Sequence, residues 1–263
     1  MLRCINIVNF LHKEKLDLIF SGNVFRKSDN LLKVRLWIYC LALIHLAVVS
    51  SKLLFIDFTK AEDPSLWVYE SVRWKLITCW FNLLSFIYLP VCIYCEVKEL
   101  LGENGEPQVK WLNNFRFLIF TSILLPTTTF ADILFWRLWM KDRELLAPAS
   151  IDSFVPFWSQ HSMHTVTLVV TMLDMVMLPR ARPKSFVPGL SLMTFFVLAY
   201  SFMCVESYVR GEYIYPVFKF FDGFKMSVLM FYVLIEHLFY YFGQFIVYDL
   251  IWARYWKESI QKL

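Results

Sequence analysis

The sequence predicts an all-α fold: a polytopic membrane helical bundle with six transmembrane helices and both termini in the cytosol. Three observations predict it. Of 263 residues, 58% are hydrophobic and only 18% are charged, whereas a soluble domain carries about 25% charged residues. The apolar residues fall in blocks close to the roughly 20 residues that span a bilayer. Tryptophans and tyrosines gather at the ends of these blocks, as they do at membrane interfaces.

Six blocks have the length and composition of membrane spans. They are Leu36–Phe55, Leu76–Tyr94, Phe117–Trp139, Trp158–Leu178, Leu190–Val205 and Met226–Ile251. The fifth block is the shortest, and the apolar stretch from Phe186 can extend it. Polar sequences rich in glycine or proline separate the blocks, for example at Gly102–Pro107 and Pro179–Lys184, where such residues favour turns.

The basic residues indicate an orientation. About 16 of the 26 lysines and arginines lie on the side of the two termini, and such an excess marks the cytosolic side. Residues 1–35 are therefore expected to form a cytosolic segment, with a surface helix over Phe10–Asn30. Residues 36–252 form the six-helix transmembrane domain in this interpretation, and residues 253–263 form a cytosolic tail. We expect an integral multi-pass protein of the endoplasmic reticulum or the plasma membrane.

Several classes of protein are excluded by composition. A net charge of +4, scattered along the chain, does not predict a nucleic-acid partner. Cys92 and Cys95 form a C-x-x-C sequence, but no second pair is present that would complete a zinc site. We interpret them as packed thiols at the end of a span.

Ionisable residues within the spans are the first candidates for function, because they are costly in a membrane. They are His45, Asp132, Arg137, His161, His164, Asp174, Glu236 and His237. Thr78 joins them near the start of the second span. At 1.5 Å per residue, Thr78 lies about 5 Å beyond Lys75, His164 about 9 Å beyond Trp158, and Asp132 about 10 Å before Trp139.

Thr78, His164 and Asp132 therefore share roughly one depth on the non-cytosolic side. A hydroxyl, an imidazole and a carboxylate are what a nucleophile, its base and a group that orients the base require. The alternatives are that Thr78 bonds to its own helix, as membrane threonines commonly do, or that His161 and His164 bind a metal. With only five histidines in the chain, we expect no metal and no cofactor.

Two motifs resemble those of a known family. Trp74-Lys-Leu-Ile-Thr78 opens the second span, and Phe154-Val-Pro-Phe-Trp158-Ser-Gln-His161-Ser-Met-His164-Thr165 opens the fourth. Both are similar to the androgen-induced and androgen-dependent TFPI-regulating protein family. The similarity covers roughly Trp74 to Trp252.

The resemblance implies an atypical threonine hydrolase that cleaves fatty acid esters of hydroxy fatty acids, with Thr78 and His164 as the essential pair. The chain departs from the family at Phe81, where members carry Asp or Asn, and Asn82 follows it. Asp132 stands where members have an apolar residue. The resemblance therefore supports Thr78 and His164 and implies no third acid.

The implied mechanism has Thr78 attack the ester while His164 accepts its proton. Lys75 and His161 are candidates for binding the carboxylate of the substrate. The expected partners are membrane lipids and a lipid ester that enters from the bilayer. The alternative is a lipid-binding or transport protein that uses the same polar residues without chemistry.

Overall fold

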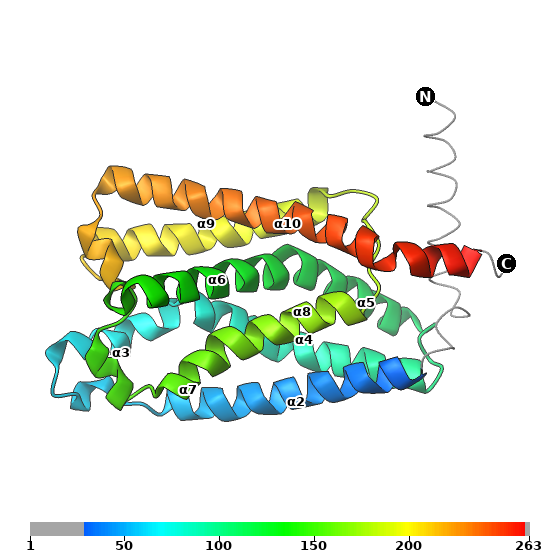
Figure 1. The fold of residues 1–263 in the computed structure, drawn as a ribbon, viewed down its shortest axis with the longest axis horizontal. Coiled ribbons are helices and arrows are strands. Elements are labelled where there is room, and N and C mark those ends of the chain that lie inside the picture. The colour runs from blue at the N-terminus through cyan, green and yellow to red at the C-terminus, as the bar shows by residue number, and fades with distance from the viewer. Residues whose placement is uncertain (1–28, 261–263) are drawn as a thin grey trace.

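The computed structural model describes residues 29–260, with side chains for residues 30–252. Over this range the chain passes six times along one helical bundle, each pass antiparallel to the one before (Figure 1). The passes are α2 (Asp29–Leu54), α4 (Ile77–Leu100), α5–η5–α6 (Pro107–Asp142), α7–η8–α8 (Phe157–Met177), α9 (Val187–Val209) and α10 (Gly223–Ile260). The surface helix expected over Phe10–Asn30 lies almost entirely outside the described residues.

Two helices end at glycines that the sequence places between apolar blocks. Gly102, with φ 76°, and Gly211, with φ 77°, follow α4 and α9 in the left-handed conformation that costs glycine little. After each of them the next residue donates its N–H back to a carbonyl five residues earlier: Glu103 to Lys98 and Glu212 to Ser207. This is the hydrogen bond of a Schellman termination.

Two passes contain a π-helix. In the third pass, η5 (Phe120–Leu124) lies between α5 (Pro107–Ile119) and α6 (Leu125–Asp142). Pro126 accounts for its position, since proline has no N–H to donate four residues back and its ring crowds the carbonyl there. In the fourth pass, η8 (His161–Val166) lies between α7 (Phe157–Gln160) and α8 (Thr167–Met177). Single π-turns of this kind are frequent at functional sites.

Five of the six predicted spans are confirmed as helices long and apolar enough to cross a membrane: Asn30–Leu54, Pro64–Leu100, Pro107–Leu145, Val187–Val209 and Gly223–Trp252. The fourth pass is also helical, but it is not among these five, and it is the one that carries Gln160, His161, His164 and Asp174. A pass with so many polar groups is expected to face other helices rather than lipid.

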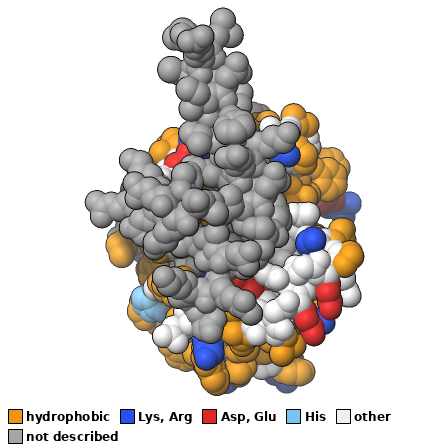
Figure 2. Space-filling view, turned by 90° about the vertical axis from the view of Figure 1, so that its right-hand side faces the viewer, with side chains coloured by type: hydrophobic (Ala, Val, Ile, Leu, Met, Phe, Trp, Pro, Cys, Tyr) orange, Lys and Arg blue, Asp and Glu red, His pale blue; other side chains and the backbone are white. Residues whose placement is uncertain are grey.

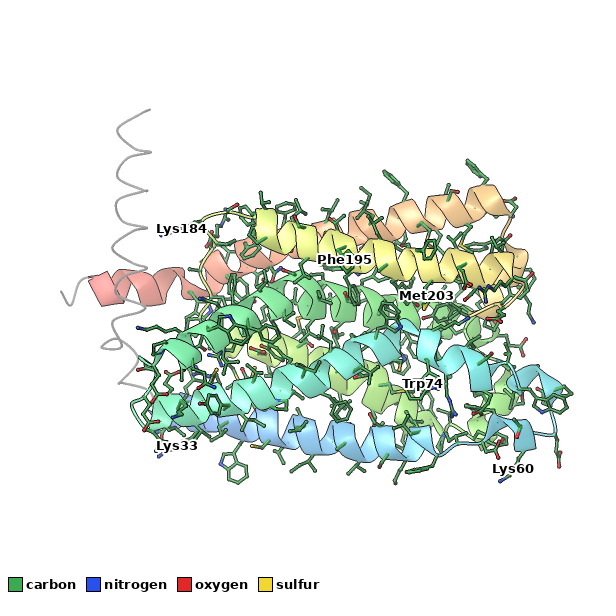
Figure 3. The ribbon with its side chains drawn as sticks, turned by 180° about the vertical axis from the view of Figure 1, so that it is seen from behind. Lys33, Lys60, Trp74, Lys184, Phe195 and Met203 are labelled. Carbon is green, nitrogen blue, oxygen red and sulfur yellow. The ribbon has the colours of Figure 1, made fainter. Side chains whose placement is uncertain are left out.

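Short helices form a cap over one end of the bundle. The cap consists of η2 (Phe58–Lys60), η3 (Pro64–Leu66), α3 (Tyr69–Val72), η4 (Arg73–Lys75), η6 (Arg143–Leu145), η7 (Ala149–Ser153) and η9 (Pro216–Phe220). Phe58, Leu66, Val72 and Ile151 belong to its own apolar core. Lys60 lies at this end, and Lys33 and Lys184 lie at the opposite end (Figure 3).

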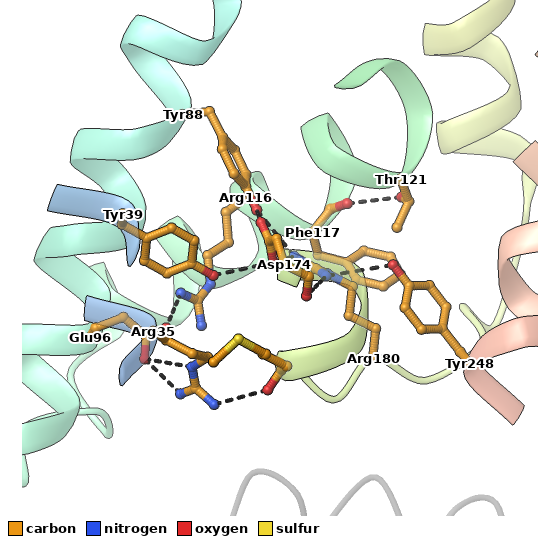
Figure 4. A network of polar contacts seen from close by, with 11 residues as sticks. Arg35, Tyr39, Tyr88, Glu96, Arg116, Phe117, Thr121, Asp174, Arg180 and Tyr248 are labelled. Atoms are coloured by element: carbon orange, nitrogen blue, oxygen red, sulfur yellow. Dashed lines mark hydrogen bonds and ion pairs between the residues drawn. The ribbon is translucent and has the colours of Figure 1, made fainter. Parts of the chain in front are cut away.

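The end opposite the cap holds a second buried structure. There α2 begins, and charged side chains appear among apolar ones around the rim (Figure 2). Inside, Glu96 accepts hydrogen bonds from Arg35 at 2.6 Å and from Arg116 at 2.7 Å, while Asp174 accepts one from Arg180 at 2.7 Å. We call these five residues, with Tyr39, Tyr88 and Tyr248, the arginine network (Figure 4).

The arginine network joins α2, α4, α5, α8 and α10 through charge. Tyr39 and Tyr88 donate hydrogen bonds to the two oxygens of Asp174, and the Arg180 guanidinium stacks 3.8 Å from the centroid of the Phe120 ring. All five charged side chains are buried. Buried charges are tolerated when they are paired and hydrogen-bonded, so this network fixes how the helices meet.

Candidate functional site

A cavity of about 570 Å³ lies inside the bundle beneath the cap. Its wall is mainly apolar and comes from α2, α4, α6, α8, α9, α10 and the cap. Thr78 and His164 both line it. The two residues that the sequence placed at one depth therefore face the same internal space.

The Thr78 hydroxyl is free to face the cavity. Other hydroxyls in the bundle donate to the carbonyl four residues earlier, as Ser85 does to Phe81 and Thr171 does to Thr167. The Thr78 hydroxyl makes no hydrogen bond to any other described residue. The reason is its place in the first turn of α4, because the carbonyl four residues back belongs to Trp74 in η4 and accepts from Trp80 instead.

His164 lies in the π-helix η8, and two residues of α6 hold its side chain. Its Nδ1 lies 2.9 Å from Asp132 Oδ1, and its ring stacks on Phe135 at a centroid distance of 3.6 Å and an angle of 9°. The residue is 5% exposed, and Nε2 makes no hydrogen bond within the described chain. One ring nitrogen is thus occupied while the other remains available.

Asp132 is fully buried on α6, at 0% exposure. Besides His164, it contacts Thr167, whose hydroxyl lies 2.8 Å from Asp132 Oδ2. We call Asp132, His164 and Thr167 the His164 cluster. The contact between Asp132 and His164 is the third component of the predicted arrangement, whereas Thr78 and His164 share the cavity wall without bonding to each other.

The other polar candidates lie elsewhere or are structural. Lys75 forms an ion pair with Glu212 at 2.6 Å, and His161 lies 3.1 Å from the Thr165 hydroxyl at the surface. Neither lines the cavity. His237 is buried, with Nδ1 2.8 Å from a carbonyl of its own helix, and His45 lines the cavity on α2.

Arg73, Asn82 and Gln160 are among the polar residues of the cavity wall that the sequence did not single out. Arg73 belongs to the cap and lies outside the predicted spans, so it was not among the ionisable residues considered there. Asn82 and Gln160 each stand four residues from a site residue, Asn82 after Thr78 and Gln160 before His164. That helical spacing places each on the same face as its partner and is the signal that identifies them.

The bundle consists of long apolar helices, and a few polar residues line an apolar cavity inside it. These features define an integral multi-pass membrane protein with an internal site. The comparison with known families agrees. The chain belongs to the FAR-17a/AIG1-like protein family, which matches residues 37–248. Thr78, Asp132 and His164 all lie within the matched region.

Several relatives are 26% to 34% identical to this chain over the parts that align. Androgen-dependent TFPI-regulating protein from Homo sapiens is 34% identical over 161 residues, which cover 61% of this chain and 66% of that protein. Its Mus musculus counterpart is 32% identical over 57% of this chain and 64% of its own length. Androgen-induced gene 1 protein from Homo sapiens is 26% identical over 61% and 69%. The match thus spans slightly less than two thirds of the first two relatives. No solved structure matches this chain.

Proposed function

We propose that this protein is a membrane threonine hydrolase that cleaves fatty acid esters of hydroxy fatty acids into a fatty acid and a hydroxy fatty acid. One observation carries the proposal. An unpartnered threonine hydroxyl and a histidine with one free ring nitrogen line the same mainly apolar cavity, and a buried carboxylate contacts the other ring nitrogen.

In this mechanism Thr78 is the nucleophile and His164 the general base. Asp132 accepts a hydrogen bond from the protonated Nδ1 of His164, which leaves Nε2 as the acceptor of the Thr78 proton. The Thr78 oxygen forms a bond to the ester carbonyl carbon, and His164 then protonates the departing hydroxy fatty acid. Water deprotonated by His164 releases the acyl chain from Thr78.

The substrate would enter from the bilayer. Leu54, Trp74 and Leu83 line the cavity and are also substantially exposed, which marks where the wall meets the lipid-facing surface. Among the described lining residues Arg73 is the one lysine or arginine. It replaces Lys75 and His161 as the cation best placed for the substrate carboxylate, although Glu70 already pairs with it.

The orientation remains the one that the basic residues favour: both termini in the cytosol, the cap and Thr78 near the opposite face, in the endoplasmic reticulum or plasma membrane. Six passes return the chain to the side on which it began, in agreement with termini on one side. Epitope tags at each end, read after selective permeabilisation, would test this. Termini on opposite faces would contradict it.

The second candidate function is lipid binding or transport without chemistry, and the apolar cavity itself favours it. Thr78→Val separates the two, because it keeps the shape of the side chain and removes the hydroxyl. Turnover should fall by at least the ~10³–10⁴-fold associated with loss of triad function in soluble hydrolases. Thr78→Ser keeps the oxygen and should retain activity.

The measurement is ester hydrolysis by purified protein, with intact mass spectrometry after a fluorophosphonate probe. An adduct on the peptide that holds Thr78 is expected in the wild type and absent in Thr78→Val. A fully active valine variant would remove the nucleophile and leave lipid binding as the better account of the cavity.

The two histidines of η8 provide a matched pair. His164→Ala should abolish hydrolysis because it removes the base, whereas His161→Ala should retain it, because His161 is exposed and does not line the cavity. Equal loss in both, together with inactivation by a chelator and recovery with zinc, would favour a metal site instead.

A further inference from the structure

Two side-chain amides face the cavity without a hydrogen-bond partner. Asn82 lies on α4 and Gln160 at the end of α7, and both line the cavity wall. Gln160 is 6% exposed, and its side-chain amide bonds to no other described residue. The Oδ1 of Asn82 is buried and unpartnered.

Such groups need an explanation, because a buried amide loses its hydrogen bonds to water, and without a partner in the protein this desolvation destabilises the fold. Gln244, on α10, also has a buried oxygen without a partner, Oε1, but its amide N–H group donates to the carbonyls of Thr121 and Tyr241 at 2.7 and 2.9 Å. Asn82 and Gln160 therefore differ from an amide whose role is to join helices.

Their positions point to a shared ligand. Asn82 follows Thr78 by four residues, and Gln160 precedes His164 by four, so each shares a helix face with one member of the proposed pair. Two neutral donors thus line the same cavity as the proposed pair. Neutral donors fit a carbonyl oxygen, which gains charge only in the transition state.

We propose that Asn82 and Gln160 form the oxyanion hole of this site, by donating their amide N–H groups to the ester carbonyl oxygen. This inference rests on the proposed hydrolase function and deepens it. As the Thr78 oxygen bonds to the carbonyl carbon, the carbonyl π electrons move to the oxygen, where the two amides stabilise the negative charge. When the tetrahedral intermediate collapses, those electrons re-form the carbonyl, the ester C–O bond breaks, and the leaving oxygen takes its proton from His164.

The test uses Asn82→Leu and Gln160→Met, which keep approximate size and remove the donors. Each should lower kcat by about 10²–10³-fold, the effect of losing one oxyanion donor in subtilisin, with little change in KM. The rate at which the fluorophosphonate modifies Thr78 should fall as well. Asn82→Asp and Gln160→Glu, closer in shape, repeat the test with a carboxylate that repels the oxyanion and serve if the apolar variants do not fold.

Asn113→Leu is the matched control. Asn113, on α5, also has a buried Oδ1 without a partner, but it does not line the cavity. Its replacement should leave kcat unchanged. If that variant lost activity as Asn82→Leu does, the effect would be general and the proposal would be wrong.

The outcomes separate this inference from the function on which it rests. Near wild-type kcat in the Asn82 and Gln160 variants, with Thr78→Val inactive, would overturn the oxyanion hole and leave the hydrolase intact. A raised KM at unchanged kcat would also overturn it, because the amides would then bind substrate and transition state equally. An inactive wild type, or an active Thr78→Val, would remove the hydrolase and the oxyanion hole together.

Discussion

The arginine network and the His164 cluster are both buried in the bundle, but they differ in how fully their polar groups are bonded. In the arginine network Glu96 and Asp174 use both carboxylate oxygens, each toward an arginine and a second donor. In the His164 cluster Asp132 is equally saturated, yet His164 Nε2 is free, and Thr78, across the same cavity, is free as well.

This difference distinguishes polar groups that stabilise the fold from polar groups that are free to react. A buried ion pair whose partners are all present holds helices together, and removal of one partner leaves an uncompensated charge. A free ring nitrogen and a free hydroxyl that line the same cavity add no such stability. These unused groups can bond only to something that enters the cavity.

The largest expected effect is the loss of turnover when Asp132, which holds His164, is replaced. Asp132→Asn should lower kcat by as much as ~10⁴-fold, because an amide no longer holds His164 in the tautomer with the proton on Nδ1. Thermal unfolding in detergent should show a folded protein, since Asn can still bond to Thr167. Activity within a few-fold of wild type would mean that Asp132 only packs against His164.

The arginine network should respond in the opposite way. Glu96→Gln leaves Arg35 and Arg116 buried without their shared carboxylate and should cost about 3–5 kcal/mol of stability, measured by unfolding in detergent. Turnover per folded molecule should be unchanged, because Glu96 does not line the cavity. Glu106→Gln is the control: its pair with Lys98 is partly exposed and should contribute at most about 1 kcal/mol. Equal stabilities of the two variants would refute the comparison.

The smallest effect should come from an exposed pair in the cap. Arg143 donates two hydrogen bonds to Asp152, at 2.7 and 2.8 Å, and this bonding lowers the pKa of Asp152 below its ordinary value. Arg143→Ala should cost less than about 1 kcal/mol, because solvent screens the pair.

Since the folded-state pKa of Asp152 is depressed, its contribution is present above the unfolded value of about 3.9 and is lost as pH falls through the folded value. The difference in Tm between wild type and Arg143→Ala should therefore be constant near neutral pH and shrink below about pH 4. A difference that persists in strong acid would assign the effect to packing of Arg143 on Trp139, 4.4 Å from the ring centroid.

Much of the fold follows from the spacing of apolar residues, and its exceptions have a physical cause. Apolar blocks located every pass, but α4 continues beyond the expected end at Tyr94 to Leu100. The sequence turns polar at Glu96, which looks like the end of a span. Arg35 and Arg116 neutralise Glu96 from other helices, and pairings between segments so far apart in the chain cannot be inferred from periodicity.

The candidate site was predicted in part. The rise per residue of an α-helix predicted that Thr78, His164 and Asp132 lie at a similar depth in the membrane, and all three lie at or beside the cavity. It could not show which nitrogen of His164 meets Asp132, because that depends on the stacking of Phe135 and on the π-turn at His161–Val166. Arg73 belongs to the cap, whose position over the bundle depends on contacts among short helices that carry little periodic signal.

The π-helix η8 also has a consequence for how the fourth pass evolves. A π-turn contains one residue more than the α-turn it replaces, and one residue corresponds to about 100° of rotation in an α-helix. The part of this pass near the cap, with Gln160, is therefore turned relative to the part that carries Asp174. Loss of a single codon within His161–Val166 would restore a regular α-helix, and it would swing either Gln160 or Asp174 away from its present neighbours. The length of this segment is accordingly as constrained as the identity of its residues.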